Sequence, residues 1–243
     1  GLGAAAAAVT IPGGGSIASA FAQDATPVDT ADIKLGGTLR MGMQSDPGGL
    51  DPQLNSATAL WKATELIYSL LTQVNPDLTV RPDLAESWDI SEDGLTYTFH
   101  LHPATFHNGR AVVASDVKYS FERLVDPATA SPTAGSLASM SSIEAPDDET
   151  VVITLSQPNA AFLVELSGMG CIIIPKEVVE ENGDLTQVAV GSGPFKFVEY
   201  VPNTHIKLEK FADYFETGRP YLDGVDMLIA AEDNSRTAAL VSG

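Results

Sequence analysis

The sequence predicts an α/β fold whose sheets combine parallel and antiparallel strands. Segments with the two-residue period of a strand alternate loosely with segments that carry apolar residues at helical spacing, and hairpin turns join some neighbouring strands. Hydrophobic residues make up 44% of the 243 residues, which is enough to build a core. The chain has no internal repeat at the periods of solenoid proteins.

The first predicted strand covers residues 37–43, which alternate in polarity. A loop rich in Gly, Pro and Asp follows at 44–52. The next apolar residues recur at the spacing of one helical face, and Asn55 or Ser56 is the expected N-cap of this helix. The apolar residues of the predicted helix are Leu60, Ala63, Ile67, Leu70 and Leu71.

The middle of the chain contains the clearest strand pattern. Residues 96–102 alternate strictly and place Tyr97, Phe99 and Leu101 on one side of a strand. Ser115 is the expected cap of the short helix that follows. The other elements predicted here are a strand at 150–155, a helical stretch at 159–166 and a buried strand at 171–174.

The last part of the chain predicts a hairpin. Strands at 195–200 and 205–211 flank the turn at 201–204. A further strand is expected at 225–229, and Asp233 or Asn234 is the expected cap of a last helix.

The charge of the chain excludes several classes of partner. There are 13 Lys and Arg residues against 32 Asp and Glu residues, which gives a net charge of −19. Nucleic-acid binding needs clustered Lys and Arg, and anionic lipid also attracts basic segments, so neither partner is expected. The only cysteine, Cys171, excludes an internal disulfide and a thiolate zinc site, and its apolar neighbours predict a buried, unreactive side chain.

The first residues have the composition of an export signal. Residues 1–22 carry no charged side chain, and Ala20, Phe21 and Ala22 form the small-x-small pattern of a cleavage site. We therefore interpret 1–22 as a remnant export signal and 23–36 as a polar linker; a lipid-proximal anchor and a low-complexity linker are the alternatives for 1–22. This predicts a location in the periplasm or at the extracellular face of the cytoplasmic membrane.

The motifs of enzymes and metal sites are missing or incomplete. The sequence has no nucleophile elbow, P-loop, dinucleotide fingerprint or zinc-protease motif, so no catalytic residue and no cofactor are predicted. Residues 89–94 imitate the opening of a calcium loop, but His100 stands where a bidentate Glu is required, and a β-turn is the preferred interpretation. His100, His102 and His107 form the only metal-like cluster, and their alternative role is on the solvent side of a half-buried strand.

Four stretches of the chain, taken in order, carry a specific resemblance. They are TLRMGMQSDPGGLDPQ with the helix ATELIYSLL; a second stretch with LAESW, DGLTYTF, FHNG and ASDVKYSFER; LSQPNAAFLVEL; and the final segment that begins VAVGSGPFKF. In these features the chain resembles the family 5 extracellular solute-binding proteins of ABC transporters, the peptide, oligopeptide and nickel type. The sequence GSGPF stands where the family has G-T-G-P-Y, and the turn near His107 departs slightly from the family pattern.

The resemblance implies a periplasmic-binding-protein-like fold of class II, the large peptide-binding type, in which two lobes close over a ligand. Family members are about twice as long, so the resemblance implies that the chain is their N-terminal half. On this interpretation residues 37–70 are the first part of lobe I, 71–187 are a subdomain inserted into it, and 188–243 are the segment that returns to it. The second lobe would then lie outside the chain.

The expected ligand contacts of lobe I lie in two loops and one helix. Ligands of open α/β sheets bind beyond the strand ends, so Gln44, Ser45 and Asp46 are candidates, with an ordinary surface turn as the alternative. Trp61 is a candidate for the cleft wall, and half-buried packing is its alternative role. The segment Gly191, Ser192 and Gly193 is a candidate for cleft lining or a hinge, against plain turn chemistry.

The function implied by the resemblance is capture of a peptide or a similar small solute for a membrane permease, by a monomer without cofactor or catalytic activity. The alternatives are a secreted acidic α/β hydrolase and a nickel- or metal-chelate-binding member of the same transporter family.

Overall fold

The computed structural model describes residues 33–232, 234 and 237. The described residues from Leu35 onward form one compact unit by their contacts. The predicted export signal and residues 23–32 of the predicted linker lie outside the described residues. Of the predicted last helix, only Asn234 and Thr237 are described, and both are helical.

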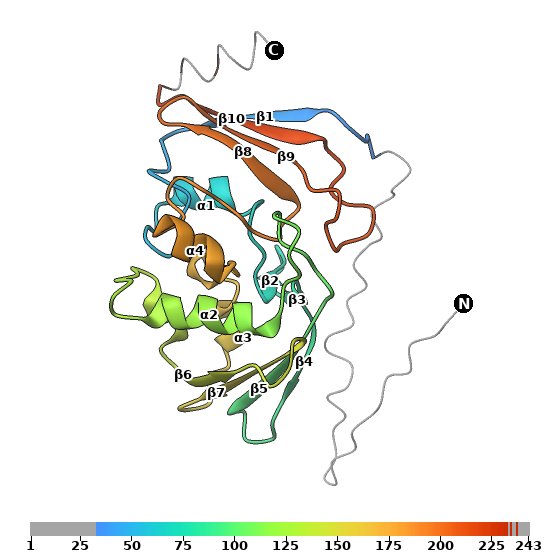
Figure 1. The fold of residues 1–243 in the computed structure, drawn as a ribbon, viewed down its shortest axis with the longest axis vertical. Coiled ribbons are helices and arrows are strands. Elements are labelled where there is room, and N and C mark those ends of the chain that lie inside the picture. The colour runs from blue at the N-terminus through green and yellow to red at the C-terminus, as the bar shows by residue number, and fades with distance from the viewer. Residues whose placement is uncertain (1–32, 233, 235–236, 238–243) are drawn as a thin grey trace, which may run out of the picture. The chain divides into compact units, whose positions relative to one another are not determined.

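One four-stranded sheet joins the two ends of the described chain (Figure 1). It contains β1 (Thr38–Met43), β8 (Phe195–Val201), β9 (His205–Lys210) and β10 (Gly224–Ile229), in the order β1-β10-β9-β8. Strand β1 is parallel to β10, whereas β9 is antiparallel to both of its neighbours. The prediction of mixed pairing is confirmed, as are the hairpin around 201–204 and the strand at 225–229.

The second four-stranded sheet is antiparallel throughout. It contains β4 (Ala85–Ile90), β5 (Thr96–Leu101), β7 (Thr150–Leu155) and β6 (Met140–Glu144), in that spatial order. A two-stranded hairpin of β2 (Thr72–Val74) and β3 (Val80–Pro82) precedes this sheet in the chain. The helical elements are α1 (Thr58–Thr64), α2 (Ala114–Val125), α3 (Phe162–Glu165), α4 (Lys176–Asn182) and the 3₁₀ turns at Ala134–Leu137 and Met169–Cys171.

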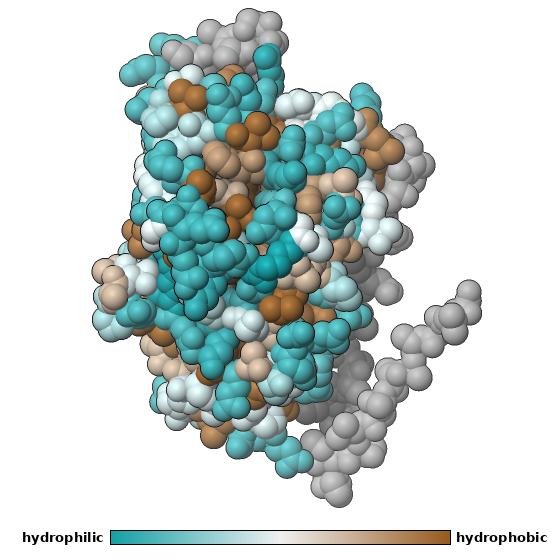
Figure 2. Space-filling view, viewed as in Figure 1, coloured by the Kyte–Doolittle hydropathy of each residue, from teal (hydrophilic) through white to brown (hydrophobic). Residues whose placement is uncertain are grey.

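The apolar periodicity predicted the core correctly. Along β5 the buried positions alternate, and Phe99 is fully buried. Helix α2 buries Val117, Phe121 and Leu124 completely. On the face that Figure 2 shows, hydrophilic side chains predominate and apolar ones form only small groups between them, as expected for a chain of this charge.

The predicted helix at 55–71 is wrong in both of its ends. Helix α1 begins at Thr58 and ends at Thr64, and its N-cap is Ala57. The side chain of Asn55 accepts a hydrogen bond from the Ala57 amide instead of capping the helix. Beyond the helix, the carbonyls of Leu66 and Ile67 accept hydrogen bonds from Phe195 and Gly193, so they are unavailable for further helical turns.

The boundaries of three other predicted elements also differ from the observed ones, and hydrogen bonds explain two of these differences. Ser115 does not cap α2, which starts one residue earlier; the Asp116 side chain accepts a 2.9 Å hydrogen bond from the Val113 amide at that end. Residues 171–174 are fully buried but are not a strand, because Ile173 donates to the Ser69 carbonyl and Ile174 to the Ser120 side chain instead of forming a ladder. The helical stretch at 159–166 shortens to α3. The sequence patterns did not predict β2, β3, β4, β6 or α4.

Candidate functional site

The parallel pair β1 and β10 defines two edges of its sheet. Thr38 lies opposite Gly224, and Met43 lies opposite Ile229, so both strands end at the same edge, which we call the carboxyl edge. The loop at 44–49 starts there, and Gln44 and Ser45 are exposed. The Ala230 amide donates to the Met43 carbonyl across this edge. Such an edge is the usual ligand-binding position in open α/β sheets.

Asp46 anchors this loop to the β8–β9 hairpin. Its carboxylate accepts hydrogen bonds from the Tyr200 hydroxyl and from the amides of Asn203 and Gly48. Burial opposes ionisation of Asp46, but these hydrogen bonds lower its pKa below the usual value. Burial and the adjacent carboxylate raise the pKa of Tyr200 to about 12, so the hydroxyl remains a donor at neutral pH. The contacts therefore give Asp46 a positioning role, and they leave Gln44 and Ser45 as the exposed polar side chains of the loop.

The segment Gly191, Ser192 and Gly193 is buried against the backbone that follows α1. A Cβ atom on Gly191 would lie 2.1 Å from the Ile67 carbonyl oxygen, and one on Gly193 would lie 2.7 Å from the Ile67 carbonyl carbon. Glycine is needed at both positions because two backbone segments meet there. The Ser192 hydroxyl is buried without a hydrogen-bond partner among the described residues.

His107 fastens the FHNG turn to the same segment. Its Nε2–H donates to the Gly193 carbonyl at 3.0 Å, and its Nδ1 accepts a 3.4 Å hydrogen bond from the Gly191 amide. Only the neutral imidazole satisfies both contacts, because the protonated ring would present a second donor to the Gly191 amide. Burial lowers the pKa of His107 to about 4, against the opposing effect of the Gly193 carbonyl.

We expect His107 to make stability depend on pH. The folded state lowers its pKa from 6.5 to about 4, so its contribution is fully present above pH 6.5 and is lost as the pH falls from 6.5 to 4. The loss should reach up to about 3 kcal/mol at the acid end. The measurement is the free energy of unfolding against pH for the native protein and for His107→Gln. Parallel curves for the two proteins between pH 7 and pH 4 would contradict this assignment.

A pocket lies at the opposite edge of the same sheet. Its volume is about 830 Å³, and its wall includes Phe195, at the start of β8, and residues 219–222, which lead into β10. Because the first residues of β10 pair with the first residues of β1, we call it the amino-edge pocket. Trp61 lines this pocket together with residues of the β2–β3 hairpin. Trp61 therefore lies in this pocket, whereas Gln44, Ser45 and Asp46 lie at the opposite edge of the sheet.

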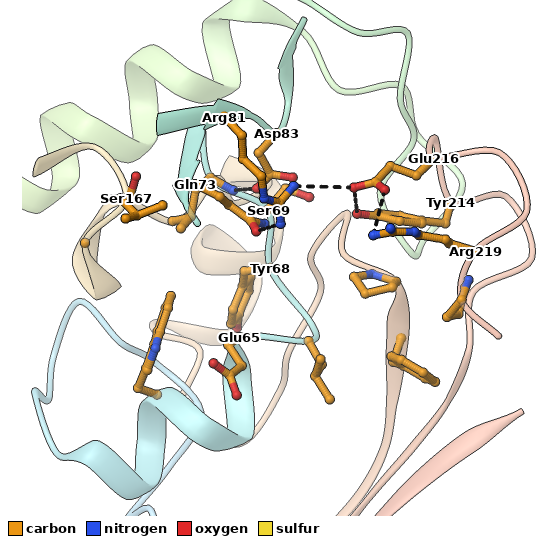
Figure 3. A pocket seen from close by; sticks show the side chains of 18 of the residues that line it. Glu65, Tyr68, Ser69, Gln73, Arg81, Asp83, Ser167, Tyr214, Glu216 and Arg219 are labelled. Atoms are coloured by element: carbon orange, nitrogen blue, oxygen red, sulfur yellow. Dashed lines mark hydrogen bonds and ion pairs between the residues drawn. The ribbon is translucent and has the colours of Figure 1, made fainter. Parts of the chain in front are cut away.

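Charged and polar side chains gather at one side of the amino-edge pocket (Figure 3). Glu216 pairs with Arg219 at 3.1 Å and with Arg81 at 4.0 Å. Asp83 is 2% exposed, and its Oδ2 accepts a 2.8 Å hydrogen bond from the Leu70 amide. Burial raises the pKa of Asp83 to about 6, with a smaller contribution from the charge of Glu216. The hydrogen bond from Leu70, the nearby Gln73 side chain and Arg81 act in the opposite direction.

The sequence patterns did not identify these polar lining residues. They come from the β2–β3 hairpin and from the loop before β10, which are far apart in the chain. The sequence offered no clear signal for Asp83, because it stands in the mixed segment VRPDLAES, where a charged residue is not unusual. Neither Gln44, Ser45 and Asp46 nor Gly191, Ser192 and Gly193 line this pocket.

The possible metal ligands do not come together. His100 lies 3.3 Å from Asp89, His102 stacks on Phe215, and His107 is held by the glycine segment. Over the described part of the chain, no group of three or more His, Cys, Asp or Glu residues could hold a metal ion. Residues 91–94, directly after β4, form the predicted turn, in which the Gly94 amide donates to the Ser91 carbonyl. Cys171 is fully buried, as predicted, and burial raises the pKa of its thiol to about 12.

Most of this chain is similar in sequence to one family of known proteins. Residues 79–243 match the family described as "Bacterial extracellular solute-binding proteins, family 5 Middle". A putative ABC transporter peptide-binding protein of Brucella ovis is 34% identical over 222 residues, which cover 88% of this chain and 42% of the relative. The chain therefore spans less than half the length of this relative and corresponds to its N-terminal part.

Solved structures have the same fold. The PBP AgaA from A. tumefaciens R10, in complex with agropinic acid, is 37% identical with a TM-score of 0.81, over 85% of this chain and 42% of that one. The periplasmic binding protein DppA from Helicobacter pylori, in complex with the peptide STSA, is 34% identical with a TM-score of 0.78, over 87% of this chain and 46% of that one. Within the described residues, no helix has the length and apolarity to cross a membrane.

Proposed function

Because this chain belongs to the bacterial extracellular solute-binding proteins of family 5, we propose that it is the N-terminal half of the solute-binding component of an ABC importer. The complete protein captures a peptide or a similar small solute between two lobes outside the cytoplasm and delivers it, chemically unchanged, to the membrane permease. It is exported by an N-terminal signal and acts as a monomer. The predicted segments 37–70 and 188–243 build lobe I, and 71–187 are its inserted subdomain.

The observation that carries this proposal is the combined match in sequence and fold. The family model covers residues 79–243, and the fold resembles that of a binding protein solved with a bound tetrapeptide, at 34% identity and a TM-score of 0.78. Hinged closure over a solute needs shaped walls and a few polar contacts, and it needs no nucleophile or tuned acid. The metal-chelate alternative is supported by NikZ from Campylobacter jejuni in complex with Ni(L-His), which is 28% identical with a TM-score of 0.75, less similar than the peptide-bound structure. None of the relatives and structures named above is a hydrolase.

We place the ligand contacts of lobe I at the carboxyl edge. Gln44 and Ser45 are exposed there, next to the ends of β1 and β10. Asp46 fixes the loop on the β8–β9 hairpin, so that these side chains are held in position before a ligand arrives. The close packing of Gly191 and Gly193 against the Ile67 backbone fixes the segment that follows α1.

The test uses the full-length protein and a panel of di- to tetrapeptides that includes Ser-Thr-Ser-Ala. Calorimetry should detect at least one ligand, and mass spectrometry should recover it intact. Replacing both Gln44 and Ser45 by Ala should weaken this ligand roughly tenfold, since each lost hydrogen bond contributes about 0.5–1.5 kcal/mol. The matched control is Gln157→Ala, an exposed amide in a loop of the other sheet, which should leave affinity unchanged. Hydrolysis of the peptide, or equal affinities for all variants, would contradict the proposal.

A further inference from the structure

The amino-edge pocket contains buried polar atoms that lack partners. Asp83 Oδ1 and Ser69 Oγ have no hydrogen-bond partner among the described residues. Both residues are only 2% exposed, and both line the pocket. Buried polar atoms are nearly always paired, because an unpaired one costs free energy. Two such atoms in one pocket wall indicate that a hydrogen-bond donor belongs there.

The charges of the pocket wall favour a positive group. The wall contains Arg81, Arg219, Glu65, Asp83 and Glu216, so its formal charge is 2 − 3 = −1. Both arginines lie beside the single carboxylate of Glu216. Asp83 and Glu65 form no ion pair with any described residue. The unbalanced charge is therefore negative.

Apart from Gln73, Ser69 and Ser167, most of the rest of the wall is apolar or aromatic. It includes Trp61, Leu66, Tyr68, Val74, Tyr214 and Tyr221. Aromatic rings attract cations through their faces, and they also bury the apolar body of a ligand. A volume of about 830 Å³ lies within the range of small-molecule pockets.

We propose that the amino-edge pocket is a second ligand site, separate from the carboxyl edge, and that it binds a small primary amine with an aromatic or branched apolar body. The ammonium group lies near Asp83 and Ser69 and supplies their missing donor. The apolar body lies against Trp61 and the tyrosines. Because this site lies at the opposite edge of the sheet from Gln44 and Ser45, the proposal does not depend on the proposed solute-binding function.

Occupancy of this site should depend on pH. Burial raises the pKa of Asp83 to about 6, and the charged or titratable groups around it are Arg81, Tyr214 and Glu216. The amine binds the ionised carboxylate, so its affinity should fall as the pH drops from 7 to 5.

The test is calorimetry on the full-length protein with 2-phenylethylamine as the probe. The neutral 2-phenylethanol and the anionic phenylacetate have a similar apolar body without the ammonium group, and they should bind much more weakly or not at all. Asp83→Asn keeps the oxygen that accepts from Leu70 and removes the charge, so it should weaken the amine by roughly 10- to 100-fold. The matched control is Asp213→Asn, an exposed acid in the loop before β10, which should bind the amine as the native protein does.

Two further variants make the result decisive. Ser69→Ala removes the other partner and should weaken the amine even if Asp83→Asn folds poorly. The Gln44 and Ser45 double variant should keep amine binding while it loses peptide binding, which separates this site from the proposed transport site. The proposal is overturned if the amine does not bind, if the alcohol binds equally well, or if Asp83→Asn and Ser69→Ala leave the affinity unchanged. Occupation of the pocket by polypeptide or by ordered water in the full-length protein, with no amine bound, would also overturn it.

Discussion

Replacing Arg123 by Met is expected to destabilise the protein by about 3–5 kcal/mol, because it leaves the buried carboxylate of Asp51 without a counterion. The side chains of Arg123 and Asp51 are 10% and 1% exposed, and Nη2 lies 2.7 Å from Oδ2. The backbone amides of Gln53 and Leu185 also donate to this carboxylate. The guanidinium also donates to the side-chain Oε1 of Gln53 at 2.6 Å. The side-chain Nε2 of Gln53 in turn donates to the Ser120 and Gly170 carbonyls. The network thus joins the loop before α1 to helix α2.

The measurement is the free energy of unfolding in urea at pH 7. The matched control is Lys118→Met on the same helix, which removes an exposed pair with Glu122 and should change stability by less than about 0.5 kcal/mol. Adding Asp51→Asn to Arg123→Met should recover part of the loss, since it removes the unpaired charge. If Arg123→Met lies within about 1 kcal/mol of the native protein, the buried pair has no such role.

Replacing Gly191 by Ala should destabilise the protein by more than about 3 kcal/mol, which lies above the usual range for overpacking. The new Cβ would lie 2.1 Å from the Ile67 carbonyl oxygen and 2.9 Å from the Tyr68 Cα. Both contacts are with backbone, so no side-chain rotation relieves them. Separating the two segments would also lengthen the hydrogen bond from the Gly193 amide to the Ile67 carbonyl.

The control is Gly135→Ala, where nothing lies within 4 Å of the added atom. It should leave stability within about 0.5 kcal/mol of the native protein. Thermal unfolding of the two variants is the comparison. Equal midpoints would show that residues 191–193 are not packed against residues 66–68 as described.

The strands with one buried face were predictable from the sequence because apolar side chains on the buried face alternate with polar side chains on the exposed face. Tyr97, Phe99 and Leu101 alternate with polar residues, and β5 follows that pattern from Thr96 to Leu101. Strand β4 was not predicted because, among its six residues, only Ala85 is buried. A strand that exposes both faces leaves no periodic signal.

The end of α1 shows what a local pattern cannot predict. Leu70 and Leu71 continue the helical spacing and are buried, yet the helix stops at Thr64. The partners that hold the following backbone extended, Gly193 and Phe195, are more than 100 residues away. Asp46 is a similar case. Its position in the loop does not reveal that its carboxylate accepts hydrogen bonds from Tyr200 and Asn203, which belong to a distant hairpin.

The sequence by itself determined the family, the mixed α/β class, the alternating core strands and the burial of Cys171, because each of these depends on residue order within short windows. The tertiary structure alone decided which edge of the sheet each candidate residue occupies. It placed Trp61 in the amino-edge pocket, left Asp83 buried there with an unpaired oxygen, and turned Asp46 and Gly191 into positioning and packing residues. The physical reason is that hydrogen-bond partners and cavity walls come from segments distant in the chain, whereas side-chain periodicity reports only on neighbours.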